Sequence, residues 1–292
     1  MLDACVIGHV THEINKIDGS VVTASAGGVV VYAGIAYRRL GLETKVITKA
    51  APADLETLVR PLHEVGIDVR HFDGGATTLF ENTYHGPELG ERTQTVRSIA
   101  SAFEAVELEG LAARIVHLGP LTSAEMSSEF VRAAARCGEW VVLDAQGLIR
   151  KVERGRVRVI DRPDLEAALP CIDILKIDAE EARTLSHERD PEAAARALAA
   201  FGPREVIVTL GAAGALICAQ GRIERVPAVR PNALADPTGC GDSFAAGYAY
   251  GRVQGLDVVK SSRFAATLAT LNLETKGPFA GTVDDVWARL PR

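Results

Sequence analysis

Paired cysteines and long apolar runs are both missing from this sequence, and each absence excludes a class of protein. The five cysteines are scattered among 292 residues without a CxxC pair, which argues against a disulfide framework or a structural zinc site and favours a reducing compartment. No uncharged apolar run reaches the roughly 18 residues that a membrane-spanning helix needs. Asp3 and His9 interrupt the basic-then-apolar pattern of a signal peptide. We therefore expect a soluble, cytoplasmic protein.

The sequence also lacks an excess of positive charge. Its formal net charge is −6 at pH 7, so general attraction to nucleic acids or anionic membranes is not expected. The most basic stretch is 150–158, where Val157 and Val159 alternate with arginines after a turn at Gly155. This alternation is typical of a solvated β-hairpin. We therefore expect neither nucleic acid nor a membrane as a partner.

What the sequence does contain is a regular alternation of short apolar runs and amphipathic segments. Such alternation indicates a mostly parallel sheet with helices on both faces, here in one α/β domain over 1–292. Residues 72–97 break the rhythm, because they are polar, rich in threonine and interrupted by glycines. They predict a small antiparallel flap, with a surface meander of no function as the alternative. The expected strands are 4–7, 45–48, 67–72, 114–118, 140–144, 172–177, 205–210 and 214–218, and the expected helices are 29–40, 53–65, 123–137, 179–186, 191–201, 241–254, 256–275 and 282–290.

The strongest chemical signal is the segment Asp236-Pro-Thr-Gly-Cys-Gly-Asp242, which directly precedes an expected helix. A Gly-x-Gly turn at a helix start leaves backbone N–H groups unpaired, and together with the helix dipole they form an anion site that suits phosphate. Asp242 alone could be a helix N-cap, but a cap does not need Asp236, Thr238 and two glycines beside it. A carboxylate next to an anion site suits phosphoryl transfer, because it can take the proton of a hydroxyl while the N–H groups stabilise the transferring group.

This segment resembles the C-terminal signature of the ribokinase-like carbohydrate kinases, the phosphofructokinase B (PfkB) family. Shorter matches follow the family order: the pair Gly27-Gly28 before a helix that ends Arg39-Leu-Gly41, the stretch Leu175-Lys-Ile-Asp-Ala-Glu-Glu181 in place of Asn-x-x-Glu, and Val208-Thr-Leu-Gly211 with Gly214. The resemblance implies a three-layer α/β/α fold with a mostly parallel central sheet. It also implies a small antiparallel β lid, with lid strands at about 9–24 and 72–97.

The same resemblance implies roles for individual residues. Asp242 would be the catalytic base, and the amides of Gly239, Cys240 and Gly241 would form the anion hole. Glu181 and Asp178 would hold Mg²⁺ through water, although Asp178 replaces the usual Asn. Asp236 and Thr238 lie where some members bind a monovalent cation such as K⁺. The residues expected to bind ATP are Asp178, Thr209, Gly211, Gly214, Thr238, Gly239, Gly241 and Asn272, and the stretch 272–281 would pass beside the adenine.

The acceptor is the less specific half of the prediction. The stretch Asp144-Ala-Gln-Gly-Leu-Ile-Arg150, with Gly8-His-Val and Tyr32, resembles the myo-inositol kinase branch. A polyol has several similar hydroxyls and no anionic group of its own, so its site needs many convergent hydrogen-bond donors and acceptors. A role for Gln146 and Arg150 in bracing their loop is an equal alternative. The residues expected to bind the substrate are Glu13, Gly28, Tyr32, Thr78, Asp144, Gln146, Arg150 and Asp242.

Other classes of protein fit less well. The chain has no Gly-x4-Gly-Lys-Ser/Thr of a P-loop kinase, no His-Arg-Asp of a protein kinase and no Gly-x-Gly-x-x-Gly after the first strand. His9, His12 and Glu13 lack the His-Glu-x-x-His spacing of a zinc site. A sugar or nucleoside kinase of the same fold, and a non-catalytic sugar-binding regulator, remain as alternatives. The lid is the candidate contact for a homodimer, and the position of the phosphate on the product is not predicted.

Overall fold

A nine-stranded, mostly parallel sheet forms the centre of the computed structural model, which describes residues 1–17, 20–85, 91–160 and 167–290. From β5 to β13 each strand runs parallel to its neighbours, while β14 and β15 are antiparallel additions at one edge. In order across the sheet the strands are β15 (Arg222–Val226), β14 (Ala215–Ala219), β13 (Glu205–Thr209), β12 (Ile174–Asp178), β9 (Gly138–Asp144), β8 (Ala113–Leu118), β1 (Leu2–Ile7), β4 (Thr44–Ala50) and β5 (Asp68–Asp73).

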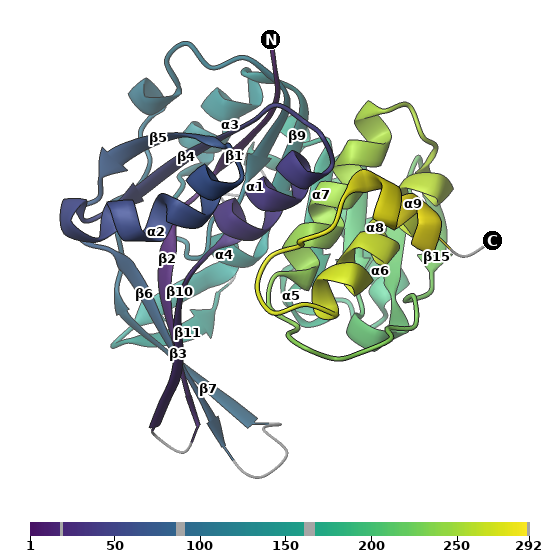
Figure 1. The fold of residues 1–292 in the computed structure, drawn as a ribbon. Coiled ribbons are helices and arrows are strands. Elements are labelled where there is room, and N and C mark those ends of the chain that lie inside the picture. The colour runs from purple at the N-terminus through teal and green to yellow at the C-terminus, as the bar shows by residue number, and fades with distance from the viewer. Residues whose placement is uncertain (18–19, 86–90, 161–166, 291–292) are drawn as a thin grey trace.

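Helices cover both faces of this sheet and divide the buried apolar residues into two clusters (Figure 1). One layer contains α1 (Val29–Arg39), α2 (Pro52–Glu64), α7 (Cys240–Val253), α8 (Val258–Leu273) and α9 (Val283–Arg289). The other contains η1 (Ala105–Leu108), α3 (Ser128–Ala135), η3 (Leu169–Cys171), α5 (Ala179–Ser186) and α6 (Pro191–Ala200). The predicted three-layer α/β/α fold is therefore confirmed.

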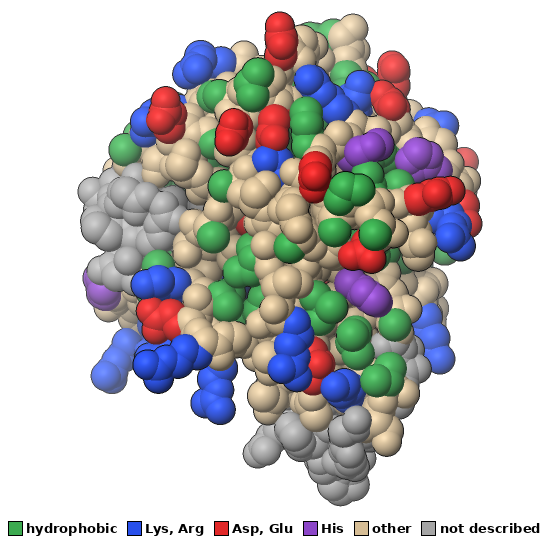
Figure 2. All heavy atoms as spheres, turned by 90° about the vertical axis from the view of Figure 1, so that its left-hand side faces the viewer, with side chains coloured by type: hydrophobic (Ala, Val, Ile, Leu, Met, Phe, Trp, Pro, Cys, Tyr) green, Lys and Arg blue, Asp and Glu red, His purple; other side chains and the backbone are tan. Residues whose placement is uncertain are grey.

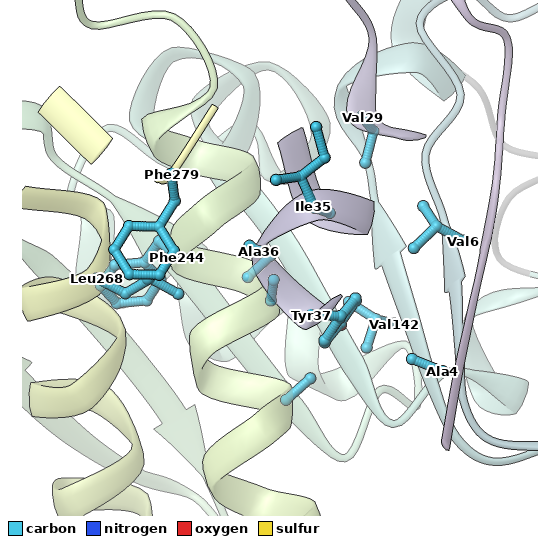
Figure 3. Packing of buried hydrophobic residues seen from close by; sticks show 14 of the residues in the cluster. Ala4, Val6, Val29, Ile35, Ala36, Tyr37, Val142, Phe244, Leu268 and Phe279 are labelled. Atoms are coloured by element: carbon cyan, nitrogen blue, oxygen red, sulfur yellow. The ribbon is translucent and has the colours of Figure 1, made fainter. Parts of the chain in front are cut away.

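The packing of α1 against α7 fixes the start of α7 relative to the sheet. Ala36 on α1 lies beside α7, Tyr37 points from α1 toward the sheet, and Phe244 and Leu268 bring α7 and α8 together (Figure 3). All four side chains are at most 5% exposed, so the helix layer is closely packed. The last three residues of the segment 236–242 thus lie at the start of a closely packed helix.

A second sheet of six strands forms the lid, which projects from the body in Figure 1. Its strands are, in order, β10 (Arg150–Glu153), β11 (Arg156–Val159), β7 (Glu91–Ser98), β6 (Thr78–His85), β2 (Thr11–Ile17) and β3 (Ser20–Gly27). The lid is larger than the two predicted segments, because the basic hairpin joins it as β10 and β11. It also contains one parallel pair, β2 with β6.

Buried hydrogen bonds attach the lid to the body. His9 Nε2 lies 3.0 Å from the carbonyl oxygen of Ser101, and His9 Nδ1 lies 2.9 Å from the hydroxyl of Thr78. That hydroxyl also accepts a hydrogen bond from the amide of Ala100 at 3.0 Å. Thr78 and His9 are fully buried. The Thr78 hydroxyl thus makes contacts within the protein at the base of the lid, and its predicted contact with the substrate stays a prediction.

Two elements differ from their sequence prediction for local reasons. The helix expected at 123–137 begins only at Ser128, because the Glu125 carboxylate accepts hydrogen bonds from the amides of Leu121 and Thr122 and stabilises a turn instead. β15 was not predicted, since its charged side chains alternate on an exposed edge.

Acidic and basic side chains are interspersed over the face of the molecule that Figure 2 shows. Among the described residues, no helix is both long enough and apolar enough to cross a membrane.

Candidate active site

Three neighbouring parallel strands bring polar residues to one edge of the central sheet. β9 ends at Asp144, β12 at Asp178 and β13 at Thr209. Because these strands are parallel, their carboxyl ends lie side by side, and this is the edge at which open α/β sheets bind ligands. The predicted substrate and donor residues of all three strands therefore meet in one region.

α7 begins in this region at a glycine turn. Gly239 is the N-cap residue, with a φ of 74° in the left-handed region that favours glycine. A β-carbon on Gly239 would lie 1.9 Å from Cδ1 of Tyr32, so the tyrosine ring packs directly on the turn. Because glycine has no side chain to cap the helix, the first amides remain available to an anion. Of the predicted anion-hole amides, that of Cys240 already donates to the carbonyl of Pro237 at 3.3 Å.

Asp242 lies in the first turn of α7 and is 9% exposed. Burial is the main cause that raises its pKa to about 7. The charges of Asp144 and Glu13 act in the same direction, while those of Lys176 and Arg150 oppose them. A carboxyl group whose pKa is near neutrality can accept a proton from an alcohol and release it again, as a general base must.

Glu13 and Tyr32 approach the same region from the lid and from α1. A β-carbon on Gly27 would lie 2.2 Å from Glu13 Oε1, so the glycine makes room for this carboxylate. Burial, followed by the carboxylates of Glu13, Asp236 and Asp242, raises the pKa of Tyr32. Glu13 from β2, Tyr32 from α1 and Asp242 from α7 are therefore close enough for their charges to affect one another.

Gly28 shapes the start of α1 beside these residues. It is the N-cap of α1, with a φ of 89°. A β-carbon there would lie 2.5 Å from the carbonyl oxygen of His9. Only glycine suits both this close approach and this backbone conformation.

Lys176 is a buried cation that the sequence analysis did not assign to the site. It lies on β12 directly opposite Asp144 on β9, and its Nζ is 2.9 Å from Asp144 Oδ2. A β-carbon on Gly241 would lie 2.9 Å from this Nζ, so the ammonium group lies against the first turn of α7. The signal that could have identified it is a lysine within an otherwise apolar strand, since a buried lysine requires a partner.

Asp144 and Gln146, both predicted to bind the substrate, have different surroundings. Asp144 is fully buried, and its two carboxylate oxygens interact with Lys176 Nζ and, at 3.3 Å, with the amide of Gln146. Gln146 begins the short helix α4 (Gln146–Ile149) and is partly exposed. Asp144 therefore braces the site from beneath, and the contact of Gln146 with the acceptor stays a prediction.

Asp178 and Glu181 form a capping box at the start of α5. The Asp178 carboxylate accepts from the amide of Glu181 at 2.8 Å, and Glu181 Oε2 accepts from the amide of Asp178 at 3.2 Å. Glu181 Oε1 also accepts from Arg150 Nη2 at 2.7 Å. Burial raises the pKa of Glu181, and the positive charge of Arg150 opposes that effect. Arg150 thus contacts a predicted magnesium residue, which supports its bracing role.

These carboxylates suit a magnesium ion that is held mainly by phosphate and water. In the described ranges no three His, Cys, Asp or Glu side chains converge as metal ligands. Mg²⁺ commonly needs only one or two carboxylates, because waters and substrate phosphates complete its coordination. Asp178 and Glu181, at the carboxyl edge of the sheet, fit that mode of binding.

The predicted donor side is a short glycine turn after β13. The hydroxyl of Thr209 donates to the carbonyl of Ile177 at 3.4 Å. η4 (Gly211–Ala213) follows, and Gly211 and Gly214 both have positive φ angles, of 58° and 95°. A β-carbon on Gly214 would lie 2.0 Å from the carbonyl oxygen of Val226, so this glycine is fixed by the strand beside it. The turn offers backbone groups but no charged side chain to a donor.

Asn272 supports the signature turn from α8. It is fully buried, and its Nδ2 donates to the carbonyl of Thr238 at 3.0 Å while its Oδ1 accepts from the hydroxyl of Ser243 at 3.2 Å. The amide of Thr238 in turn donates to Asp236 Oδ1 at 2.9 Å. Asn272 therefore holds the turn in place, and its contact with ATP stays a prediction.

A buried carboxylate of raised pKa beside an uncapped helix start, with a fixed cation underneath, is the arrangement of a phosphotransferase with a hydroxyl acceptor. The profile of the pfkB family carbohydrate kinases matches residues 4–284. The chain therefore belongs to the pfkB family of carbohydrate kinases, and it is a sugar or nucleoside kinase of the ribokinase-like group.

Individual relatives differ in their substrates. A cytidine kinase from Thermococcus kodakarensis is 28% identical over 97% of this chain and 100% of its own. A pyrophosphate-dependent kinase of the ribokinase family, solved with a pyrophosphate analogue and myo-inositol, is 28% identical with a TM-score of 0.87, covering 98% of this chain and 99% of the other. Arabidopsis thaliana ribokinase, solved with ribose and ATP, shares the fold at 20% identity and a TM-score of 0.79, covering 100% of this chain and 99% of the other.

Proposed function

We propose that this protein transfers the terminal phosphoryl group of ATP to a hydroxyl of myo-inositol or a closely related polyol. The observation that carries the proposal is the position of Asp242, at an amide-lined helix start and in the electrostatic environment of Glu13 and Tyr32. Support for the polyol comes from the relative solved with myo-inositol, whose chain aligns with nearly all of this one.

In the proposed reaction Asp242 takes the proton of the attacking hydroxyl. The hydroxyl oxygen forms a bond to the terminal phosphorus, and the bond from that phosphorus to the leaving diphosphate oxygen breaks, so ADP departs. Amides at the start of α7 stabilise the charge on the transferring group, which is why the turn must keep its glycines. A bound Mg²⁺ would offset the charge of the donor phosphates, and Asp178 and Glu181 would hold it through water.

Pyrophosphate is the second candidate donor. The relative solved with myo-inositol is pyrophosphate-dependent. The turn Gly211-Ala-Ala-Gly214 bears no side chain longer than a methyl group, so its contribution to a nucleotide would come from the backbone alone. The donor should therefore be tested together with the acceptor rather than assumed.

A nucleoside is the second candidate acceptor, favoured by the cytidine kinase that aligns along its full length. The deciding experiment is a panel in which ATP or pyrophosphate is paired with myo-inositol, other polyols, ribose, fructose and cytidine, with magnesium present. We expect myo-inositol to give the highest kcat/KM. Turnover only with cytidine would replace the polyol assignment, and binding of a sugar without turnover of either donor would favour the non-catalytic regulator.

Asp242→Asn tests the base within the same panel. Loss of the proton acceptor should lower kcat by about 100-fold or more while donor binding stays near that of the wild type. In the wild type, kcat/KM should fall as the pH falls below about 7, because protonated Asp242 cannot accept a proton. Unchanged kcat in the variant would show that another group is the base.

A further inference from the structure

We infer that Lys176 is a positioning residue for the proposed transfer: clamped by Asp144 beneath the first turn of α7, it keeps Asp242 in its charged, proton-accepting form. The inference rests on the proposed role of Asp242 as the base. Lys176 acts through Asp242 and is not itself required to touch the substrate.

The geometry of Lys176 leaves its ammonium group little freedom. Its side chain is 7% exposed and that of Asp144 is fully buried, with 2.9 Å between Nζ and Oδ2. The two residues are direct partners on adjacent strands, so the sheet fixes their separation. Gly241 lets the ammonium group lie against the helix turn, since a β-carbon there would come within 2.9 Å of Nζ.

Lys176 is the cation with the largest favourable effect on the charged form of Asp242. The groups that act on Asp242 from other elements are Asp144, Lys176, Glu13 and Arg150, in that order of effect. Arg150 is partly exposed and already paired with Glu181, so its charge acts on Glu181 as well as on Asp242. Tyr32 and Cys240 are the other titratable groups nearby, and burial keeps both neutral near pH 7 by raising the pKa of each.

The surroundings of Lys176 favour its charged form. Burial alone would lower its pKa, but the carboxylates of Asp144, Asp242 and Glu181 outweigh burial and raise it. A neighbouring positive charge stabilises the charged form of a carboxylate and so lowers its pKa. When a donor brings further negative charge to the start of α7, the same cation would oppose protonation of Asp242.

The test uses three variants of the full chain: Lys176→Met, Asp144→Asn and the double variant. The titration midpoint of the Asp242 carboxyl is measured by ¹³C NMR without magnesium or donor, with Asp242→Asn to assign the signal. Lys176→Met should raise the midpoint by about one pH unit or more, since an opposite charge at this range lowers a carboxyl pKa by about 1–3. Asp144→Asn should lower it, and the double variant should lie between the two single variants.

A merely structural ion pair predicts something else, because both single variants would then disturb the same contact alike. A shift in the same direction for both, or no shift for Lys176→Met, would overturn the inference. If Lys176→Met does not fold, comparison of Asp144→Asn with the double variant isolates the lysine, and the midpoint should still rise.

The acid limb of the kcat/KM profile should move with these midpoints. If the NMR midpoints shift as expected but no donor and acceptor pair gives turnover, the proposed function fails while the effect of Lys176 on the charge of Asp242 stands.

Discussion

Two glycines at the start of α7 are needed for different physical reasons. Gly239 combines a left-handed backbone with the ring of Tyr32 directly above it, and Gly241 makes room for the ammonium group of Lys176. Neither neighbour is close in sequence, because Tyr32 comes from α1 and Lys176 from β12. The turn is thus the point at which three segments of the chain meet.

Gly239→Ala tests whether the contact with Tyr32 matters for activity. The new β-carbon would displace the ring or the turn, and a shift of about 1 Å at a reacting group can cost about 100-fold in rate. The matched control is Gly255→Ala, at a φ of 81° with no atom within 4 Å of the added carbon. Both variants should lose about 1–2 kcal/mol of stability from the left-handed backbone. Only Gly239→Ala should lose kcat, measured with the acceptor identified by the panel; equal kcat losses would assign the effect to the backbone alone.

Residues of the site could be predicted from the sequence when their signal is contiguous. Asp242 and its glycines lie in one short segment, and the capping box of Asp178 and Glu181 spans four positions. Lys176 was missed, because its partner Asp144 comes from another strand. The hydrogen bonds of Asn272 with Thr238 and of Thr78 with His9 could not be predicted for the same reason, since each joins distant segments of the chain.

At the scale of elements, the ion pair of Arg150 and Glu181 joins the lid hairpin to α5. Arg150 begins β10, while Glu181 is buried in the first turn of α5. The pair is therefore a direct connection between the lid and the carboxyl edge of the central sheet. Its short distance of 2.7 Å indicates a charge-assisted hydrogen bond.

Arg150→Met should weaken this connection. Glu181 would remain buried without its cation, and we expect a loss of about 1–3 kcal/mol in the free energy of unfolding, reduced toward the lower value by the partial exposure of Arg150. The control is Arg97→Met, which removes an exposed partner of Glu81 on the lid and should change stability little. Urea unfolding measures both. Equal midpoints for the two variants would show that the pair with Glu181 contributes no more than a surface contact.

Elements with a strong local signal were predicted closely, and those that depend on distant partners were not. The bounds of α5 match the prediction because its capping box lies within the helix start. The parallel pairing of β2 with β6 could not be predicted, since it joins segments separated by β3, α1, β4, α2 and β5. The late start of α3 depends on the single side chain of Glu125.

At the scale of the whole molecule, the lid and the body meet through a buried polar group centred on His9. Its ring contacts Thr78 and Ser101, and its Nδ1 lies 3.5 Å from Glu125 Oε2, with both side chains fully buried. Buried polar contacts of this kind fix one arrangement, because a displaced lid would leave them unsatisfied. The lid strand β2, which carries Glu13, is therefore held in one place relative to the body.

Thr78→Val tests this attachment with little change in shape. The variant removes the acceptor of the Ala100 amide and a partner of His9, so about 1–3 kcal/mol of stability should be lost. Hydrogen exchange should increase in β2 and β6, and the KM of the acceptor should rise more than kcat falls, because Glu13 would be held less firmly. Thr95→Val, at a half-buried position on β7 of the same sheet, is the control and should leave exchange at the lid base unchanged. If Thr78→Val lowers stability without faster exchange in β2 and β6, the hydroxyl serves the core alone and the lid is positioned by other contacts.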